Sequence, residues 1–117
     1  MACQSQSQGT DAYTRLDVPS FKEKLDTTPN AQILDVRTSG EVSKGYIENA
    51  IHIDYYSKDF QTRIQKLDKA KPVFVYCHSG VRSHNTGKLL TKLGFQKIYE
   101  LKQGFIGWKN YQLKTVK

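Results

Sequence analysis

The clearest indication of the fold is the stretch Val73-Phe74-Val75-Tyr76-Cys77-His78-Ser79-Gly80-Val81-Arg82-Ser83. Its first four residues are β-branched or aromatic, follow a proline, and predict a buried strand. A helix is predicted over residues 83–93, because leucines recur there at helical spacing and Gly94 is suited to end it. A polar loop, residues 77–82, therefore joins a strand to a helix.

The alternation of strand and helix extends outward from this stretch in both directions. Short apolar runs predict further strands at residues 13–16, 32–36, 51–53 and 98–101. Further helices are predicted at residues 18–25, 38–44, 59–67 and 105–111. Strands that alternate with helices form a parallel sheet covered on both faces. The predicted fold class is α/β, with a central parallel five-stranded sheet flanked by helices on both faces.

Length and composition are those of one small globular domain. The chain has 117 residues, of which 38% are hydrophobic and 25% charged, so it can enclose one core and does not have the composition of a disordered chain. We expect a disordered tether at residues 1–12, a domain at 13–112 and a tail at 113–117. No run reaches the roughly 18 apolar residues of a membrane span, and we expect no intact signal peptide, since residues 1–30 lack its apolar core.

The formal net charge is +7, from 18 Lys and Arg against 11 Asp and Glu. Clustered basic residues would indicate nucleic-acid binding, because they release counterions from the phosphate backbone. Here the basic residues are dispersed, and Asp59 and Asp68 interrupt the group between residues 58 and 71. We therefore expect no nucleic-acid partner.

The two cysteines, Cys3 and Cys77, are too far apart in the sequence for a C-x-x-C motif. That spacing excludes a disulfide framework or a zinc knuckle as the basis of the fold. His78 and His84 flank the loop, but together with Cys77 their spacing matches no zinc site. We expect neither a metal nor a cofactor.

The loop at residues 77–82 has the features of an anion-binding cup. It follows the carboxyl end of a strand, where open parallel sheets bind ligands, and precedes a helix N-terminus with unpaired N–H groups. Gly80 permits positive φ, so that successive amides can converge, while Arg82 and His78 add positive charge. Cys77 supplies an anion as its thiolate and is expected to be a nucleophile at neutral pH. Two other interpretations stay open: Cys77 as a small core residue, and the loop as a phosphate site.

The active-site loop of the rhodanese family of sulfurtransferases resembles Cys77-His78-Ser79-Gly80-Val81-Arg82-Ser83. Three further segments agree with the family in order and spacing. They are Asp35-Val36-Arg37, Glu41 with Gly45-Tyr46-Ile47-Glu48-Asn49-Ala50-Ile51-His52-Ile53, and Gln103-Gly104-Phe105-Ile106-Gly107-Trp108. The resemblance extends over residues 13–112 and implies a rhodanese-like fold.

The chain departs from the family pattern at three positions. Tyr46 replaces a histidine, and Asn49 and Gln103 replace glycines. Asparagine tolerates positive φ, so we expect the turn around residue 49 to be preserved. Gln103 lies near a loop that borders the active site in the family, and is expected to alter access or donor preference.

The resemblance implies a rhodanese-type sulfurtransferase. Cys77 would take a sulfane sulfur from a small anionic donor, namely thiosulfate, a polysulfide or a persulfide, and pass it as a Cys77 persulfide to a thiol, a protein acceptor or cyanide. The substrate-binding residues it implies are His78, Ser79, Gly80, Val81, Arg82 and Ser83. The supporting residues it implies are Asp35 and Arg37 as a scaffold pair, with Glu41 as a partner for Arg37.

The length of the loop separates two chemistries on related folds. Six residues, 77–82, run from the cysteine through the arginine, as in the sulfurtransferases, whereas the related phosphatases and arsenate reductases have seven. Phosphatase or arsenate-reductase-like chemistry is the alternative enzyme. A sulfur carrier or binding module without turnover is the alternative outside the enzymes. Single-domain members of the family are monomers or weak dimers, and we expect a monomer.

The N-terminus Met1-Ala2-Cys3-Gln4-Ser5 resembles a truncated bacterial lipoprotein start. Lipidation of Cys3 would give a periplasmic lipoprotein that reaches the membrane only through this anchor. An incidental cysteine in a disordered tail would leave a cytoplasmic enzyme. Both interpretations stay open.

Overall fold

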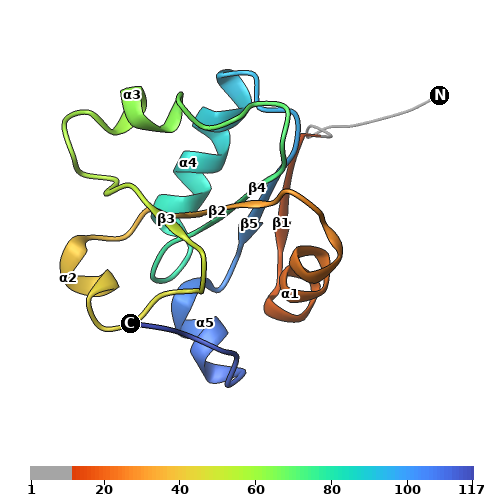
Figure 1. The fold of residues 1–117 in the computed structure, drawn as a ribbon, viewed down its shortest axis with the longest axis vertical. Coiled ribbons are helices and arrows are strands. Elements are labelled where there is room, and N and C mark those ends of the chain that lie inside the picture. The colour runs from red at the N-terminus through yellow and green to blue at the C-terminus, as the bar shows by residue number, and fades with distance from the viewer. Residues whose placement is uncertain (1–11) are drawn as a thin grey trace.

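The computed structural model describes residues 12–117, and Cys3 lies outside them, as does the predicted tether apart from its last residue. Helices and strands alternate along the described chain (Figure 1). In order they are β1 (Tyr13–Leu16), α1 (Val18–Thr27), β2 (Gln32–Asp35), α2 (Ser39–Val42), β3 (Ile51–His52), α3 (Phe60–Ile64), β4 (Val73–Tyr76), α4 (Val81–Lys92), β5 (Ile98–Leu101) and α5 (Gly104–Asn110).

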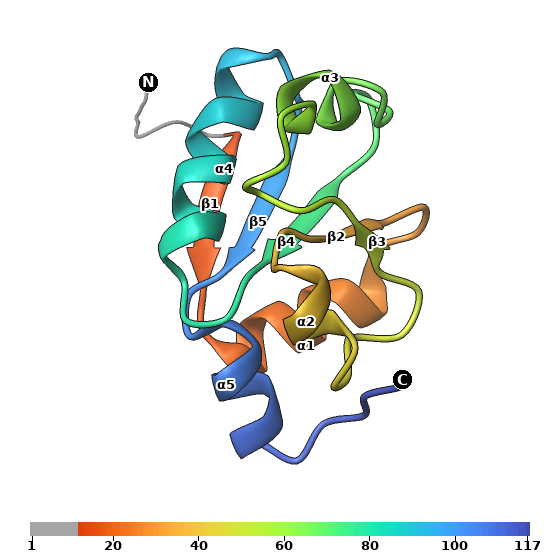
Figure 2. The same ribbon diagram turned by 90° about the vertical axis from the view of Figure 1, so that its left-hand side faces the viewer.

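All five strands are parallel and form one sheet in the order β1-β5-β4-β2-β3. The strand β4 lies in the middle, between β5 and β2 (Figure 2). Its last residue, Tyr76, is followed directly by Cys77. Ligand sites of parallel sheets lie beyond the carboxyl ends of the central strands. The predicted α/β fold class, a five-stranded parallel sheet covered by helices, is confirmed.

Each face of the sheet has its own hydrophobic core, and β4 contributes to both. Val73 and Val75 point into the core that α3 and α4 cover, whereas Phe74 and Tyr76 point into the core that α1 and α5 cover. All four side chains are fully buried. Burial of one such side chain contributes about 1.5–3 kcal/mol, so β4 anchors the segment that ends at Cys77.

The helix α4 begins two residues earlier than predicted. Gly80 is its N-cap residue and adopts φ +106°, a left-handed conformation that lets the chain turn directly from the loop into the helix. Val81 and Arg82, predicted as loop, therefore form the first helical turn. Their amides belong to the N-terminus of a 12-residue helix.

The helices α2 and α3 are shorter than the predicted spans 38–44 and 59–67. Both are followed by tight turns whose hydrogen bonds join residues three apart in the sequence. Examples are the bonds from Lys44 N to Glu41 O at 3.2 Å and from Lys66 N to Arg63 O at 3.1 Å. Such turns are typical where a short helix tightens at its C-terminus. The predicted boundaries therefore included the turn that follows each helix.

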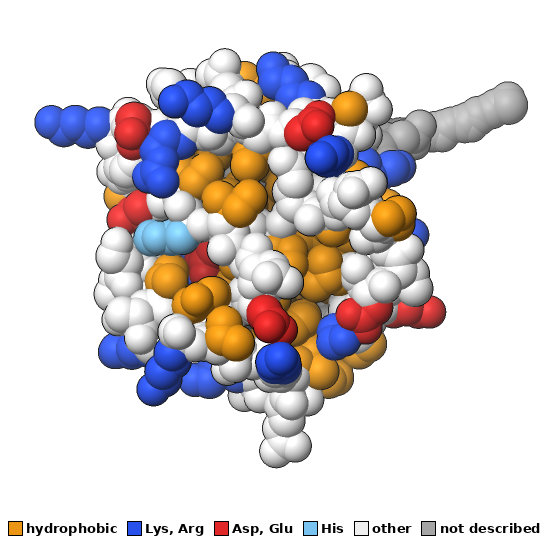
Figure 3. Space-filling model, viewed as in Figure 1, with side chains coloured by type: hydrophobic (Ala, Val, Ile, Leu, Met, Phe, Trp, Pro, Cys, Tyr) orange, Lys and Arg blue, Asp and Glu red, His pale blue; other side chains and the backbone are white. Residues whose placement is uncertain are grey.

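The last residues of the chain pack against the segment between α2 and β3. Val116 and Tyr46 form an antiparallel bridge with both N–O distances at 2.9 Å, and Lys114 pairs with Glu48 at 3.0 Å. Within residues 12–117, no helix is long and apolar enough to span a membrane. On the face seen in Figure 3, Lys and Arg side chains are interspersed with Asp and Glu.

Candidate active site

The start of the loop after β4 is fixed to α5. The carbonyl of Cys77 accepts from the Phe105 amide at 2.8 Å, and the carbonyl of His78 accepts from the Ile106 amide at 3.2 Å. Gly104 makes this close approach possible, because it adopts φ +66° and a Cβ there would lie 2.3 Å from the His78 carbonyl oxygen. The position of the candidate nucleophile therefore depends on this glycine.

Two of the three departures from the family pattern have a structural explanation. Asn49 adopts φ +72°, which confirms that it replaces glycine in a left-handed conformation. Gln103 has φ −87°, which any residue tolerates, and its Oε1 accepts the Val18 amide at 3.1 Å. That amide belongs to the first turn of α1, where helices leave N–H groups unpaired. Gln103 thus joins α1 to α5.

Cys77 is buried, with 1% of the residue exposed, and its sulfur accepts hydrogen bonds from two backbone amides. These are the amide of Gly80, at 3.1 Å from Sγ, and that of Ser83, at 3.3 Å. Within residues 12–117, four more amides of the loop and first helical turn have no acceptor: His78, Ser79, Val81 and Arg82. The Cys77 sulfur thus faces the backbone N–H donors of the loop and of the first turn of α4.

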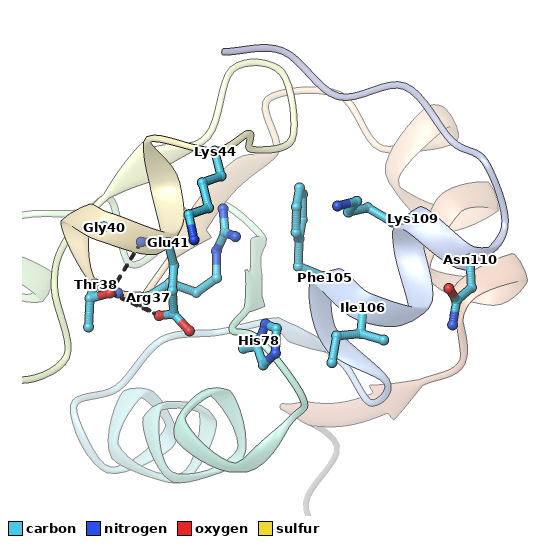
Figure 4. A pocket seen from close by; sticks show the side chains of 10 residues that line it. All are labelled: Arg37, Thr38, Gly40, Glu41, Lys44, His78, Phe105, Ile106, Lys109 and Asn110. Atoms are coloured by element: carbon cyan, nitrogen blue, oxygen red, sulfur yellow. Dashed lines mark hydrogen bonds between the residues drawn. The ribbon is translucent and has the colours of Figure 1, made fainter.

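The predicted substrate-binding residues have different surroundings. Gly80 and Ser83 contact the Cys77 sulfur through their backbone amides. Ser79 and Val81 are exposed, Val81 by 68%, and within residues 12–117 neither side chain forms a hydrogen bond with the Cys77 sulfur. The imidazole of His78 lines a neighbouring cavity (Figure 4).

A buried carboxylate, Glu100 of β5, lies behind the candidate nucleophile. The Cys77 thiol donates to Ser83 Oγ at 3.3 Å, and the Ser83 hydroxyl donates to Glu100 Oε2 at 2.6 Å. The other carboxylate oxygen accepts from the Tyr13 hydroxyl at 3.0 Å and from Arg15 Nε. Burial and the charge of Glu100 raise the pKa of the Tyr13 hydroxyl. Sequence reasoning missed Glu100; the available signal was one charged residue inside an otherwise apolar strand.

The guanidinium of Arg82 is paired with Glu41, not directed at Cys77 as a free charge. The pair is bidentate, with Nη1–Oε1 at 2.9 Å and Nη2–Oε2 at 3.0 Å. Arg82, followed by the amide and hydroxyl of Thr38, lowers the pKa of Glu41 to about 2. The predicted pairing of Glu41 with Arg37 is therefore wrong. Sequence distance hid the true partner, because only the sheet brings α2 beside the start of α4.

Asp35 and Arg37 form a buried scaffold on the other side of the loop. The Asp35 carboxylate accepts Arg37 Nε at 3.0 Å, Arg37 Nη2 at 2.8 Å and the Tyr76 hydroxyl at 2.6 Å. Arg37 also donates to the Gly45 carbonyl at 2.7 Å, and its guanidinium lies 4.1 Å from the centre of the Phe105 ring. Burial and the charge of Asp35 raise the pKa of Tyr76. This pair holds α2 and α5 around the loop.

A cavity of about 500 Å³ opens beside the loop, between α2 and α5 (Figure 4). The residues that line it are Arg37, Thr38, Gly40, Glu41, Lys44, His78, Phe105, Ile106, Lys109 and Asn110. Because His78 directly follows Cys77, a molecule in this cavity lies next to the loop. No group of three or more potential metal ligands occurs within the described part of the chain.

The sequence-family model described as "Rhodanese-like domain" matches residues 17–111 of this chain. The chain belongs to the rhodanese-like domain family. It is 38% identical over 77 residues to the thiosulfate sulfurtransferase GlpE of Coxiella burnetii, a match that covers 66% of this chain and 70% of GlpE. It is 28% identical over 101 residues to a sulfurtransferase of Allochromatium vinosum, across 86% of this chain and 92% of that protein.

A third relative is about twice as long as the matched region. The chain is 28% identical over 102 residues to the Bacillus subtilis protein named "Putative sulfur carrier protein YrkF" and spans 54% of its length. Among solved structures, a rhodanese-related protein from Thermoplasma volcanium superposes with a TM-score of 0.78 at 25% identity, over 89% of this chain and 98% of that one. This rhodanese-like domain thus has relatives named both as sulfurtransferases and as a sulfur carrier.

Proposed function

We propose that this rhodanese-like domain is a sulfurtransferase that carries sulfane sulfur on Cys77. The observation that carries the proposal is the arrangement of amides around Sγ: two already donate to the sulfur, and four more in the same loop and helical turn have no acceptor in the described chain. Such a cup stabilises a thiolate before the reaction and an anionic outer sulfur after it.

The first step with thiosulfate balances without an added oxidant. The Cys77 thiolate attacks the outer sulfur of thiosulfate, a new S–S bond forms, and the bond to the sulfonate sulfur breaks with sulfite as leaving group. The product is the Cys77 persulfide anion. The amides of Val81 and Arg82 are proposed to hold its terminal sulfur, with the partial positive charge of the α4 N-terminus.

The second step transfers the outer sulfur to an acceptor thiolate. The acceptor attacks the terminal sulfur, the S–S bond to Cys77 breaks, and the electron pair returns to Cys77 as a thiolate. In this proposal Glu41 and Asp35 take no part in bond making. They hold Arg82 and Arg37, and through them the walls of the site, in place.

Turnover distinguishes this function from its alternatives. Sulfite release from thiosulfate with a small thiol as acceptor is expected for the wild-type chain and not for Cys77→Ser. Loading of Cys77 without turnover would identify a sulfur carrier instead. Hydrolysis of an aryl phosphate that Cys77→Ser abolishes, without sulfite release, would identify a phosphatase.

A further inference from the structure

The cavity between α2 and α5 contains two lysines that have no acidic partner. Lys44 follows α2 and Lys109 lies near the end of α5, and both side chains extend toward the cavity (Figure 4). Within residues 12–117 neither ammonium group forms a salt bridge or hydrogen bond, and that of Lys109 lies 5.9 Å from the centre of the Phe105 ring. The cavity therefore has uncompensated positive charge from two separate elements.

The other charged groups of the cavity are already neutralised. Glu41, its one acidic side chain, forms the bidentate pair with Arg82, and Arg37 forms its pair with Asp35. An anion in the cavity would thus meet attraction from Lys44 and Lys109 without breaking an existing ion pair. Charges at the mouth of a partly enclosed site also raise the local concentration of oppositely charged ligands.

The shape of the cavity indicates a ligand larger than an inorganic sulfur donor. Its volume of about 500 Å³ is typical of sites for organic small molecules. Phe105 and Ile106 form an apolar part of its wall, with Ile106 43% exposed and available for contact. His78 connects this wall to the loop that carries Cys77.

We propose that the cavity binds the sulfur acceptor, and that the acceptor is a small thiol with two carboxylates on a carbon skeleton. This inference rests on the proposed sulfurtransferase function. The carboxylates pair with Lys44 and Lys109, the skeleton packs against Phe105 and Ile106, and the thiol reaches the persulfide past His78. Its thiolate forms the new S–S bond, and Cys77 leaves with the electron pair of the old one.

The test measures the selectivity of the second step alone. Protein loaded with thiosulfate and freed of donor is mixed with mercaptosuccinate, which has two carboxylates, or with the neutral 2-mercaptoethanol. The rate of sulfur loss from Cys77 is recorded per unit concentration of thiolate. We expect the wild-type chain to prefer mercaptosuccinate.

Two variants and one matched control locate the effect. Lys44→Gln and Lys109→Gln are each expected to lower the ratio of the two rates about 1.5-fold to fivefold, the range of an exposed ion pair. Lys92→Gln, at the far end of α4, removes the same charge and should keep the wild-type ratio. High salt should reduce the preference in the wild type.

A wild-type ratio near one, or an equal fall in Lys92→Gln, would overturn the proposal, as would a preference unchanged in both cavity variants. A separate test of the cavity uses no sulfur chemistry: succinate is added, and its binding is monitored by the NMR shifts of the Phe105 and Ile106 amide resonances. If Cys77 never loads, the proposed function fails. Weaker succinate binding in Lys44→Gln and Lys109→Gln would even then support a dicarboxylate site, and no binding would overturn it.

Discussion

The pair between Glu41 and Arg82 gives the sharpest test of how the site is held together. We predict that Glu41→Gln destabilises the fold at neutral pH and that this loss disappears in acid. Glutamine has the shape of glutamate and can still accept the Thr38 amide, which Glu41 accepts at 2.9 Å in the capping box of α2. The substitution therefore removes the charge that faces Arg82 and keeps the helix cap.

The magnitude follows from the pKa of Glu41, which falls from 4.5 to about 2 on folding. At about 1.4 kcal/mol per pH unit, this change sets a ceiling of about 3 kcal/mol at pH 7. The Glu41 side chain is 30% exposed, so solvent screening reduces the expected loss to about 1–2 kcal/mol. Because the folded pKa is the lower one, the stabilisation is complete above pH 4.5 and is lost as the pH falls toward 2.

The assay is urea unfolding of the wild type and Glu41→Gln at several pH values between 7 and 2. The difference in free energy of unfolding should be constant from pH 7 to about 5 and should then shrink toward zero. Glu48→Gln is the control, because Glu48 pairs with Lys114 at the surface and should change stability little at any pH. A Glu41→Gln deficit that is the same at pH 7 and pH 2.5 would refute the reasoning.

Three further substitutions test other parts of the site. Gly104→Ala should cost at least about 2 kcal/mol in urea unfolding, because φ is +66° and the new Cβ meets the His78 carbonyl; an equal effect of Gly40→Ala, where no atom lies within 4 Å, would contradict this cause. Tyr76→Phe should cost about 1–3 kcal/mol, since the Ile47 amide loses its acceptor and Asp35 a donor, and Tyr99→Phe is the control. Glu100→Gln should lower the melting temperature by the equivalent of about 1–3 kcal/mol, because Arg15 and Ser83 lose a charged acceptor, and an unchanged melting temperature would show that this buried network contributes no stability.

Local sequence patterns were sufficient to predict the elements of the sheet. The run Val73–Tyr76 is continuous and apolar because β4 is buried on both faces, which is the property that the pattern reports. The boundaries of α2, α3 and α4 were less accurate, because turns and a left-handed glycine, not hydrophobic periodicity, determine where those helices begin and end.

The candidate site was predictable only where its residues are close in sequence. Cys77, Gly80 and Ser83 lie in one loop, and the structure brings both amides to the sulfur. The partners Glu41 and Arg82 are 41 positions apart, and Glu100 reaches Cys77 only because β5 lies beside β4. Contacts of this kind depend on strand order, which no single segment of the sequence determines.

The central claim, that Cys77 carries sulfur, is tested most directly by intact-mass measurement after incubation with thiosulfate. Cys3→Ser serves as the background, because it leaves Cys77 as the only cysteine of the chain. We predict a gain of one sulfur atom, removed by a small thiol and absent when Cys77→Ala is added. No gain in the Cys3→Ser chain, or a gain that persists after Cys77→Ala, would contradict the account.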